Sequence, residues 1–181
     1  LLVRGDRNIR VFAAVVALAE FALSIVVFAR YDLESDERFQ LVDKVEDWFP
    51  IGSFDVQYFL AVDGLSAPMV LLTGLLGMVA VYASWSVKHR VREYFMWLLA
   101  LQTAVMGVFT ALDFFLFFLF WELELVPMFF LISIWGSGRK EYSAMKFLIF
   151  TFVGSAFMLV GILALFFSTG TCDMTELPKE I

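Results

Sequence analysis

Glu122 lies inside a stretch of sequence that is otherwise suited only to lipid. The stretch covers residues 114–127 and reads FFLFFLFWELELVP. An ionisable side chain near the middle of a bilayer costs about 2.5–3.5 kcal/mol on insertion scales, and such residues commonly serve ion or proton movement. A buried carboxyl group can hold a proton near neutral pH and release it when a cation or water approaches. Glu122 is therefore a candidate proton carrier, and the alternative is a purely structural hydrogen bond to a neighbouring helix.

Two neighbours of Glu122 bear on its chemistry. Glu124 follows two positions later, so on a helix the two carboxyl groups point about 200° apart and do not share one pocket. Pro127 lacks an N–H, which leaves the carbonyl of Leu123 without its usual intrahelical partner. Freed carbonyls in membrane helices are satisfied by water, side chains or neighbouring helices. Pro127 thus indicates either a hydrated distortion beside Glu122 or a role in shaping the helix alone.

Two further charged residues lie within apolar segments. Lys146 stands near the basic end of the segment 142–167, where its ammonium group either snorkels to the interface or modulates the proton affinity of Glu122. The two residues are offset by roughly 16 Å along the membrane normal, so any coupling between them runs through water or other residues. Glu20, in the first apolar segment, is another intramembrane acid, with no motif around it.

Five apolar segments position these residues. Hydrophobic residues make up 61% of the chain, well above the roughly 45–50% of a soluble domain. A hydrocarbon core of about 30 Å takes about 20 residues of helix, and the continuous apolar runs differ from the alternating pattern of a membrane barrel. The sequence predicts an all-α, polytopic transmembrane helix bundle, a single membrane domain over residues 1–181 with spans at 11–29, 65–85, 94–112, 114–135 and 142–167.

The distribution of charge predicts the orientation of these spans. Basic residues precede the first span and fill the connections after the second and fourth spans, whereas the connection 30–63 is acidic. Basic loops stay cytoplasmic, so the acidic loop 30–63 is expected outside. Asp63 and Asp113 stand where spans begin, and an aspartate there can accept hydrogen bonds from free backbone N–H groups. Asp113 also makes the tight junction between two spans and is expected at the outer surface.

Cofactor chemistry leaves no signal in this sequence. Cys172 is the single cysteine, so the chain forms no internal disulfide and no cysteine-based metal site. We find no glycine-rich phosphate loop, metal-ligand cluster or nucleophile motif. Electron transfer is therefore not expected of this chain.

A series of motifs matches one known family in order. The motifs are VDGLSAPMVLLTGLLG at 62–77, FFLFWELELVPM at 117–128, LISIWG at 131–136 and AMKFLIFT at 144–151. The series resembles the antiporter-like subunit M of NADH:quinone oxidoreductase, respiratory complex I. The resemblance covers about residues 59–167, and the residues before it agree in hydropathy more than in motif.

The resemblance implies a larger antiporter-like subunit built around inverted repeats, of which this chain would be an N-terminal portion. It places the essential glutamate of the family at Glu122 and a family lysine at Lys146. Glu124 departs from the family, which usually has an apolar residue there. The central lysines and the distal glutamate of the family come from later helices that this chain does not contain.

The implied function is proton pumping driven by quinone reduction elsewhere in the complex, in the bacterial inner membrane. Flavin, iron–sulfur clusters and quinone are expected in partner subunits, with none held by this chain. The expected partners are other membrane subunits, including neighbouring antiporter-like subunits, and the lipid bilayer, but no nucleic acid. Two alternatives stay open: a subunit of a multisubunit cation/proton antiporter or membrane-bound hydrogenase, and a purely structural membrane subunit.

Overall fold

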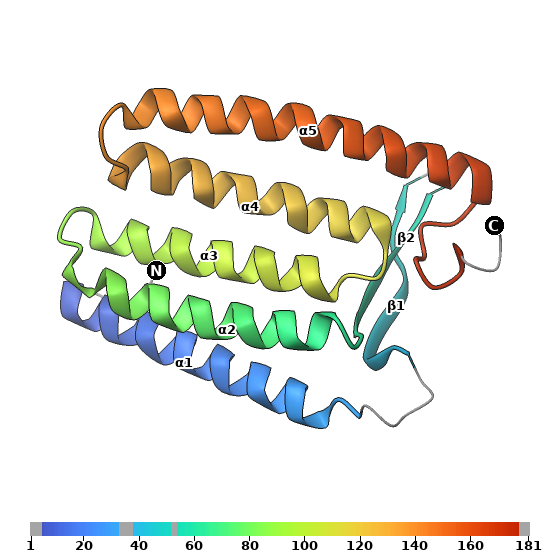
Figure 1. Cartoon of the computed structure of the whole chain (residues 1–181), viewed down its shortest axis with the longest axis horizontal. Coiled ribbons are helices and arrows are strands. Elements are labelled where there is room, and N and C mark those ends of the chain that lie inside the picture. The colour runs from blue at the N-terminus through green and yellow to red at the C-terminus, as the bar shows by residue number, and fades with distance from the viewer. Residues whose placement is uncertain (1–4, 33–37, 52–53, 178–181) are drawn as a thin grey trace.

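The computed structural model describes residues 5–32, 38–51 and 54–177, and it is a row of five long helices (Figure 1). Each helix packs against the next in sequence, and α1 also contacts α3. All five are long and apolar enough to cross a membrane, so the predicted transmembrane helix bundle is confirmed. The helices are α1 (Asp6–Arg30), α2 (Ser66–Ala83), α3 (Val91–Thr110), α4 (Phe114–Trp135) and α5 (Lys140–Thr169).

The helix bounds follow the predicted spans closely, with small differences at the ends. α4 has the predicted bounds, whereas α1 and α5 take in charged residues that the apolar spans left out. At 30 residues, α5 is about 45 Å long and exceeds a hydrocarbon core of about 30 Å. It ends at Gly170, whose φ of 78° is the left-handed conformation that commonly terminates helices.

The three basic segments come together at one end of the bundle, which also holds the short 3-10 helix η1 (Ser84–Ser86) (Figure 1). The Arg10 guanidinium donates to the carbonyl of Val87 at 2.9 Å, and the Trp135 indole donates to the carbonyl of His89 at 2.8 Å. These bonds join the start of α1, the loop before α3 and the end of α4. The arrangement agrees with the orientation that the positive-inside rule predicts.

The opposite end carries a β-hairpin that the sequence analysis did not predict. Strand β1 (Gln40–Ile51) pairs antiparallel with β2 (Phe54–Val62), with Lys44 opposite Phe59. The hairpin packs onto the bundle because Phe59 and Ala61 are buried, and the Leu112 N–H donates to the Phe59 carbonyl at 2.9 Å. Aromatic and β-branched residues favour such half-buried strands. We call this the hairpin end.

Asp113 caps α4 at the hairpin end, as predicted, and its side chain is buried there. Its Oδ1 accepts hydrogen bonds from the backbone N–H groups of Phe115 and Leu116, both at 2.9 Å. The residue is only 1% exposed, so other parts of the chain cover this cap. One of them is the segment 171–177, which folds over the junction: the Phe114 N–H donates to the Cys172 carbonyl at 2.9 Å.

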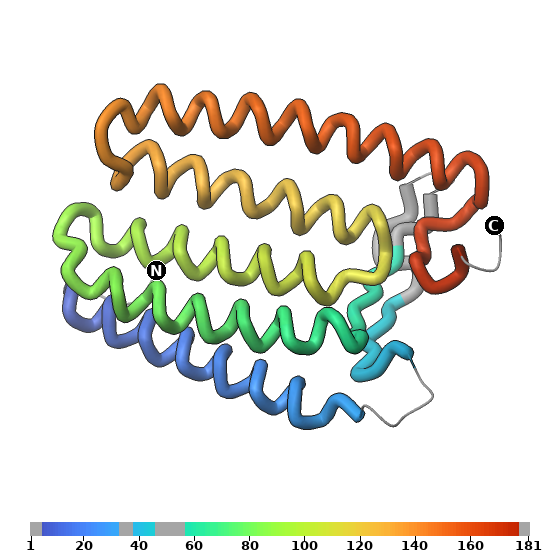
Figure 2. Tube along the Cα trace, in the orientation of Figure 1, coloured from blue at the N-terminus to red at the C-terminus, as the bar shows by residue number. Residues whose placement is uncertain are grey.

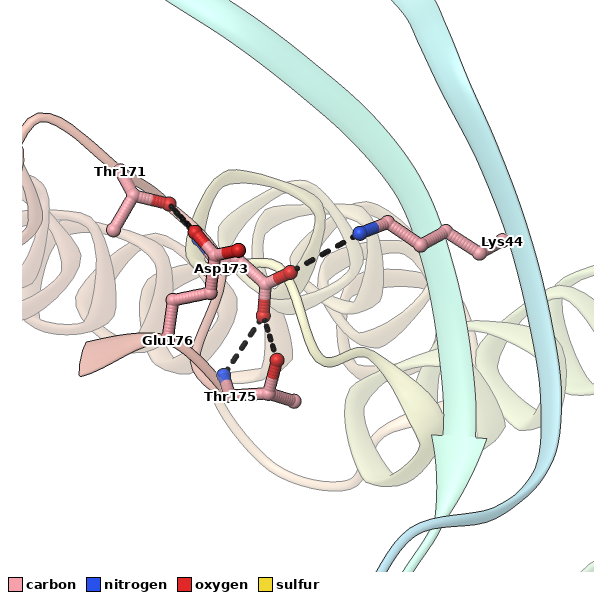
Figure 3. Close-up of polar contacts among 5 residues, drawn as sticks. All are labelled: Lys44, Thr171, Asp173, Thr175 and Glu176. Carbon is pink, nitrogen blue, oxygen red and sulfur yellow. Dashed lines mark hydrogen bonds and ion pairs between the residues drawn. The ribbon is translucent and has the colours of Figure 1, made fainter. Parts of the chain in front are cut away.

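Asp173 ties that segment to the hairpin (Figure 3). Its Oδ2 lies 3.3 Å from Lys44 Nζ, and its Oδ1 accepts from the backbone N–H and the hydroxyl of Thr175 at 2.8 and 2.6 Å. Lys44 Nζ also lies 4.9 Å from the centre of the Phe59 ring. Because the Lys44 side chain is 30% exposed, solvent screens the ion pair, and we expect it to contribute about 1 kcal/mol or less.

We predict that Asp113→Asn changes how stability depends on pH. Burial raises the pKa of the Asp113 carboxyl, against the lowering effect of its backbone hydrogen bonds. The folded state therefore holds that proton more tightly than the unfolded state. The stability that Asp113 contributes then falls as pH rises from its ordinary pKa of 3.8 through the raised one. An Asn oxygen keeps the cap without the buried charge.

Thermal unfolding in detergent at several pH values measures this effect. The melting temperature of Asp113→Asn, relative to that of the parent protein, should be highest at neutral pH and lowest at acidic pH. Asp113→Ala, which loses the cap oxygen, should cost about 1 kcal/mol at neutral pH. If the parent protein instead became more stable relative to Asp113→Asn as pH rises, that result would contradict the raised pKa of the Asp113 carboxyl.

We also predict slow modification of Cys172 by maleimides. Burial, together with the nearby Asp113 charge, raises the pKa of its thiol to about 11. At pH 8 the reactive thiolate is then about one part in a thousand. Glu176→Cys in a Cys172→Ala background places a thiol at an exposed position of the same segment. In intact cells, a membrane-impermeant maleimide should label residue 176 rapidly and Cys172 slowly. Equal rates would contradict the burial, and no labelling at 176 would contradict the orientation.

Candidate functional site

Glu122 lies eight residues into α4, about 12 Å along the helix axis from Phe114 at the hairpin end. Its side chain is half-buried. One carboxyl oxygen, Oε1, is fully buried and has no hydrogen-bond partner among the described residues. Leaving a buried polar atom unsatisfied costs about 1–3 kcal/mol, so this oxygen is a strong acceptor for a proton or a hydrogen-bond donor.

The packing of α3 on α4 sets the direction of the two glutamates. The Phe120 ring lies against Gly107, where a Cβ would meet it at 2.2 Å, and Trp97 stacks on Phe130 with ring centres 4.5 Å apart. Phe120 and Phe130 therefore face α3. Glu122 is two residues, about 200°, from Phe120 and turns away from α3, whereas Glu124 is about 40° from Phe120 and lies on the α3 side. The two acids occupy different faces of α4.

Pro127 is almost completely buried, and α4 runs through it as one continuous helix. The structure therefore shows no break in the helix beside Glu122. The missing N–H still leaves the Leu123 carbonyl without its usual helical donor. Pro127 serves the packing of α4 and places a free acceptor next to the Glu122 position.

Lys146 is not paired with Glu122. The face of α5 that packs inward carries the buried residues Ala144, Ser155 and Ile162. Lys146 is two residues from Ala144, so it lies on the opposite side of α5, and its side chain is exposed. Its Nζ lies 5.8 Å from the centre of the Phe150 ring, one turn further along the same helix. Among the described residues the structure shows no ion pair for Lys146.

Gln102 is a polar residue of the bundle that sequence reasoning missed. It comes from α3, is 5% exposed, and its side-chain amide faces the carboxyl group of Glu20 on α1. The contact falls short of a well-aligned hydrogen bond, because neither amide atom has such a partner among the described residues. The available signal was simple: Glu20 and Gln102 are an acid and an amide in segments of otherwise apolar or weakly polar residues.

The described part of the chain offers no candidate metal site. No group of three or more His, Cys, Asp or Glu side chains there could hold a metal ion. The chemistry that this arrangement can perform is the binding and release of protons by carboxyl groups inside apolar helices.

Comparison of the sequence with known proteins finds one family. The family model described as "NADH:quinone oxidoreductase/Mrp antiporter, TM" matches residues 111–181, which include Glu122, Pro127 and Lys146. NAD(P)H-quinone oxidoreductase chain 4 2 of Thermosynechococcus vestitus is 46% identical over 168 residues, which are 92% of this chain and 31% of that protein. Chain 4 1 of Synechococcus elongatus is 44% identical over 176 residues, 96% of this chain and 32% of that protein. The chain thus spans about a third of the length of these curated relatives.

Solved structures show the same fold. A chain of respiratory complex I from Thermus thermophilus matches with a TM-score of 0.78 and 23% identity, over 94% of this chain and 35% of that one. A chain of the archaeal membrane-bound sulfane sulfur reductase matches with a TM-score of 0.76 and 19% identity, over 93% and 34%. With five membrane-length helices in this fold and relatives above 40% identity, the chain is a multi-pass membrane protein that belongs to the NADH:quinone oxidoreductase/Mrp antiporter family of membrane proteins.

Proposed function

We propose that this chain is part of a proton-translocating membrane subunit of an NADH:quinone oxidoreductase, with Glu122 as a proton carrier. The observation that carries the proposal is the buried, unpartnered Oε1 of Glu122 within an apolar helix. The names of the relatives favour this function over a multisubunit antiporter or a hydrogenase. The fold alone does not distinguish these functions from one another, because a chain of the sulfane sulfur reductase shares it.

In this mechanism Glu122 takes up a proton, holds it within α4 and passes it on when its surroundings change. Moving one proton against 100 mV takes about 2.3 kcal/mol. A change of about two units in the pKa of one carboxyl group corresponds to a similar free energy, at about 1.36 kcal/mol per unit. The Leu123 carbonyl, freed by Pro127, supplies an acceptor that can hold water beside the acid. Glu124, on the other face of α4, has no assigned part in this transfer.

The redox reaction belongs to other subunits in this proposal. Flavin, iron–sulfur clusters and quinone are held by partners, and quinone reduction there changes the electrostatic environment of the membrane subunits. The partners include neighbouring antiporter-like subunits, and the complex lies in the bacterial inner membrane. Here the chain supplies the proton path and carries no electrons.

Lys146 enters the proposal as a modulator of proton affinity, acting through groups outside the described residues. It lies on the exposed side of α5 together with large apolar side chains such as Phe150 and Phe157. Such a side of a membrane helix suits either lipid or further helices of a longer protein. A cation there would favour ionised acids in whatever packs against it.

We predict that Glu122→Ala and Glu122→Gln lower NADH-driven proton translocation at least about tenfold, because neither side chain can exchange a proton. Glu122→Asp keeps a carboxyl group and should retain part of the activity. The measurement is acidification of inverted membrane vesicles, with complex assembly checked in each variant. Glu141→Gln, the same change at an exposed position of α5, is the control and should behave as the parent. Normal translocation by Glu122→Ala would remove Glu122 from the proton path.

We predict a smaller effect for Lys146→Met, since its ammonium group acts at a distance. Translocation should fall by about two- to tenfold, with the pH optimum displaced, because a removed cation changes the proton affinity of nearby acids. Lys146→Arg keeps the charge and should preserve the optimum. An unchanged pH profile in the Met variant would mean that Lys146 only reaches toward the membrane surface.

A further inference from the structure

Glu20 is an acid at mid-membrane depth on the opposite side of the bundle from Glu122. It lies ten residues from both Arg10 and Arg30, about 15 Å along α1 in each direction. The other charged residues of the three helices that pack here are confined to helix ends: Asp6, Arg7, Arg10 and Arg30 on α1, and Arg92 and Glu93 on α3. α2 contains no Asp, Glu, Lys, Arg or His. Glu20 therefore has no counter-ion at its own depth among the described residues.

The Gln102 amide packs directly against α2 because Gly77 has no side chain there. A Cβ on Gly77 would lie 1.9 Å from Gln102 Nε2, so the amide occupies the space that any other residue at position 77 would fill. The three helices lie side by side in Figure 2, and α1 contacts both α2 and α3. The packing thus brings an acid from α1 and an amide from α3 together beside α2, which has no charged side chain.

The amide is a partner for both protonation states of a carboxyl group. Its Nε2 can donate to a carboxylate, and its Oε1 can accept from a protonated carboxyl. An arginine or lysine at the same place would instead hold the acid ionised. A glutamine facing an acid therefore suits a group that gains and loses a proton.

A cavity of about 220 Å³ reaches Gln102 from between α2 and α3. Its lining is largely apolar, with Thr73, Gly77, Leu98 and Gln102 among the residues that form it. The Gln102 amide nitrogen and oxygen are fully buried and have no hydrogen-bond partner among the described residues, so both are available to a carboxyl group.

We propose that Glu20 and Gln102 form a second intramembrane proton-binding site, in which Glu20 binds the proton and Gln102 is the positioning residue. The site is separate from Glu122, since α3 lies between α1 and α4 in the row of helices. Gln102 and Gly107 are five residues apart, about 140° around α3, and Gly107 is the residue that faces α4.

The test is acid–base-induced infrared difference spectroscopy of the full-length protein in its complex, between about pH 5 and pH 9, in the carboxylic C=O region. The readout needs no NADH, so it stands apart from the proposed pump. Glu20→Gln should lose one carboxyl signal while the complex still assembles, because Gln keeps a donor and an acceptor for Gln102. Ser24→Ala, a buried non-titrating change one turn further along α1, should keep the parental spectrum. Glu122→Gln should remove a different signal or none.

Gln102→Leu tests the positioning role. Without the amide, the Glu20 signal should remain but move to higher frequency, because a carboxyl carbonyl released from a hydrogen bond stretches at higher frequency. A parental spectrum for Glu20→Gln, or the same loss in Ser24→Ala, would overturn the proposal. Should Glu20→Gln fail to assemble, Glu20→Asp decides the matter: a displaced carboxyl signal supports the site, and an unchanged spectrum overturns it.

Discussion

A polar group inside the membrane has to find its partner within the protein, and this requirement governs the whole bundle. The helices satisfy their own backbone groups, which is why five of them can cross lipid. Side chains such as Glu122, Glu20 and Gln102 are the exceptions that the packing has to accommodate. Each is costly at that depth, so each marks a place where the fold has been shaped around a chemical group.

Close helix contacts make these placements possible. Gly77 lets α2 pass directly over the Gln102 amide, and Gly107 lets α3 receive the Phe120 ring of α4. Each contact fixes the rotation of a helix about its axis and thereby the direction of an acid. Because α3 separates the two sides of the bundle, Glu20 and Glu122 belong to separate polar environments. At the hairpin end, Asp113 and Asp173 serve structure, as helix cap and as ion-pair partner to Lys44.

Much of the fold, and the position of Glu122 within an apolar helix, could be predicted because lipid imposes a simple rule on sequence. The lengths of the apolar segments predicted the five helices, and the motifs around Glu122 indicated the family. The hairpin escaped prediction because an acidic, aromatic connection carries no single period strong enough to identify strands. Gln102 escaped because an amide in an apolar segment has chemical meaning only once its neighbour is known.

The amino-acid sequence by itself determined that this chain is a membrane helix bundle, that α4 carries an acid, and which family it belongs to, because these depend on composition and local order. The tertiary structure decided the direction of each polar side chain: Glu122 turned away from α3, Lys146 left on the exposed side of α5, Asp113 buried, and Gln102 against Gly77. Helix rotation is set by the fit of side chains between neighbouring helices, and residues far apart in the sequence supply that fit.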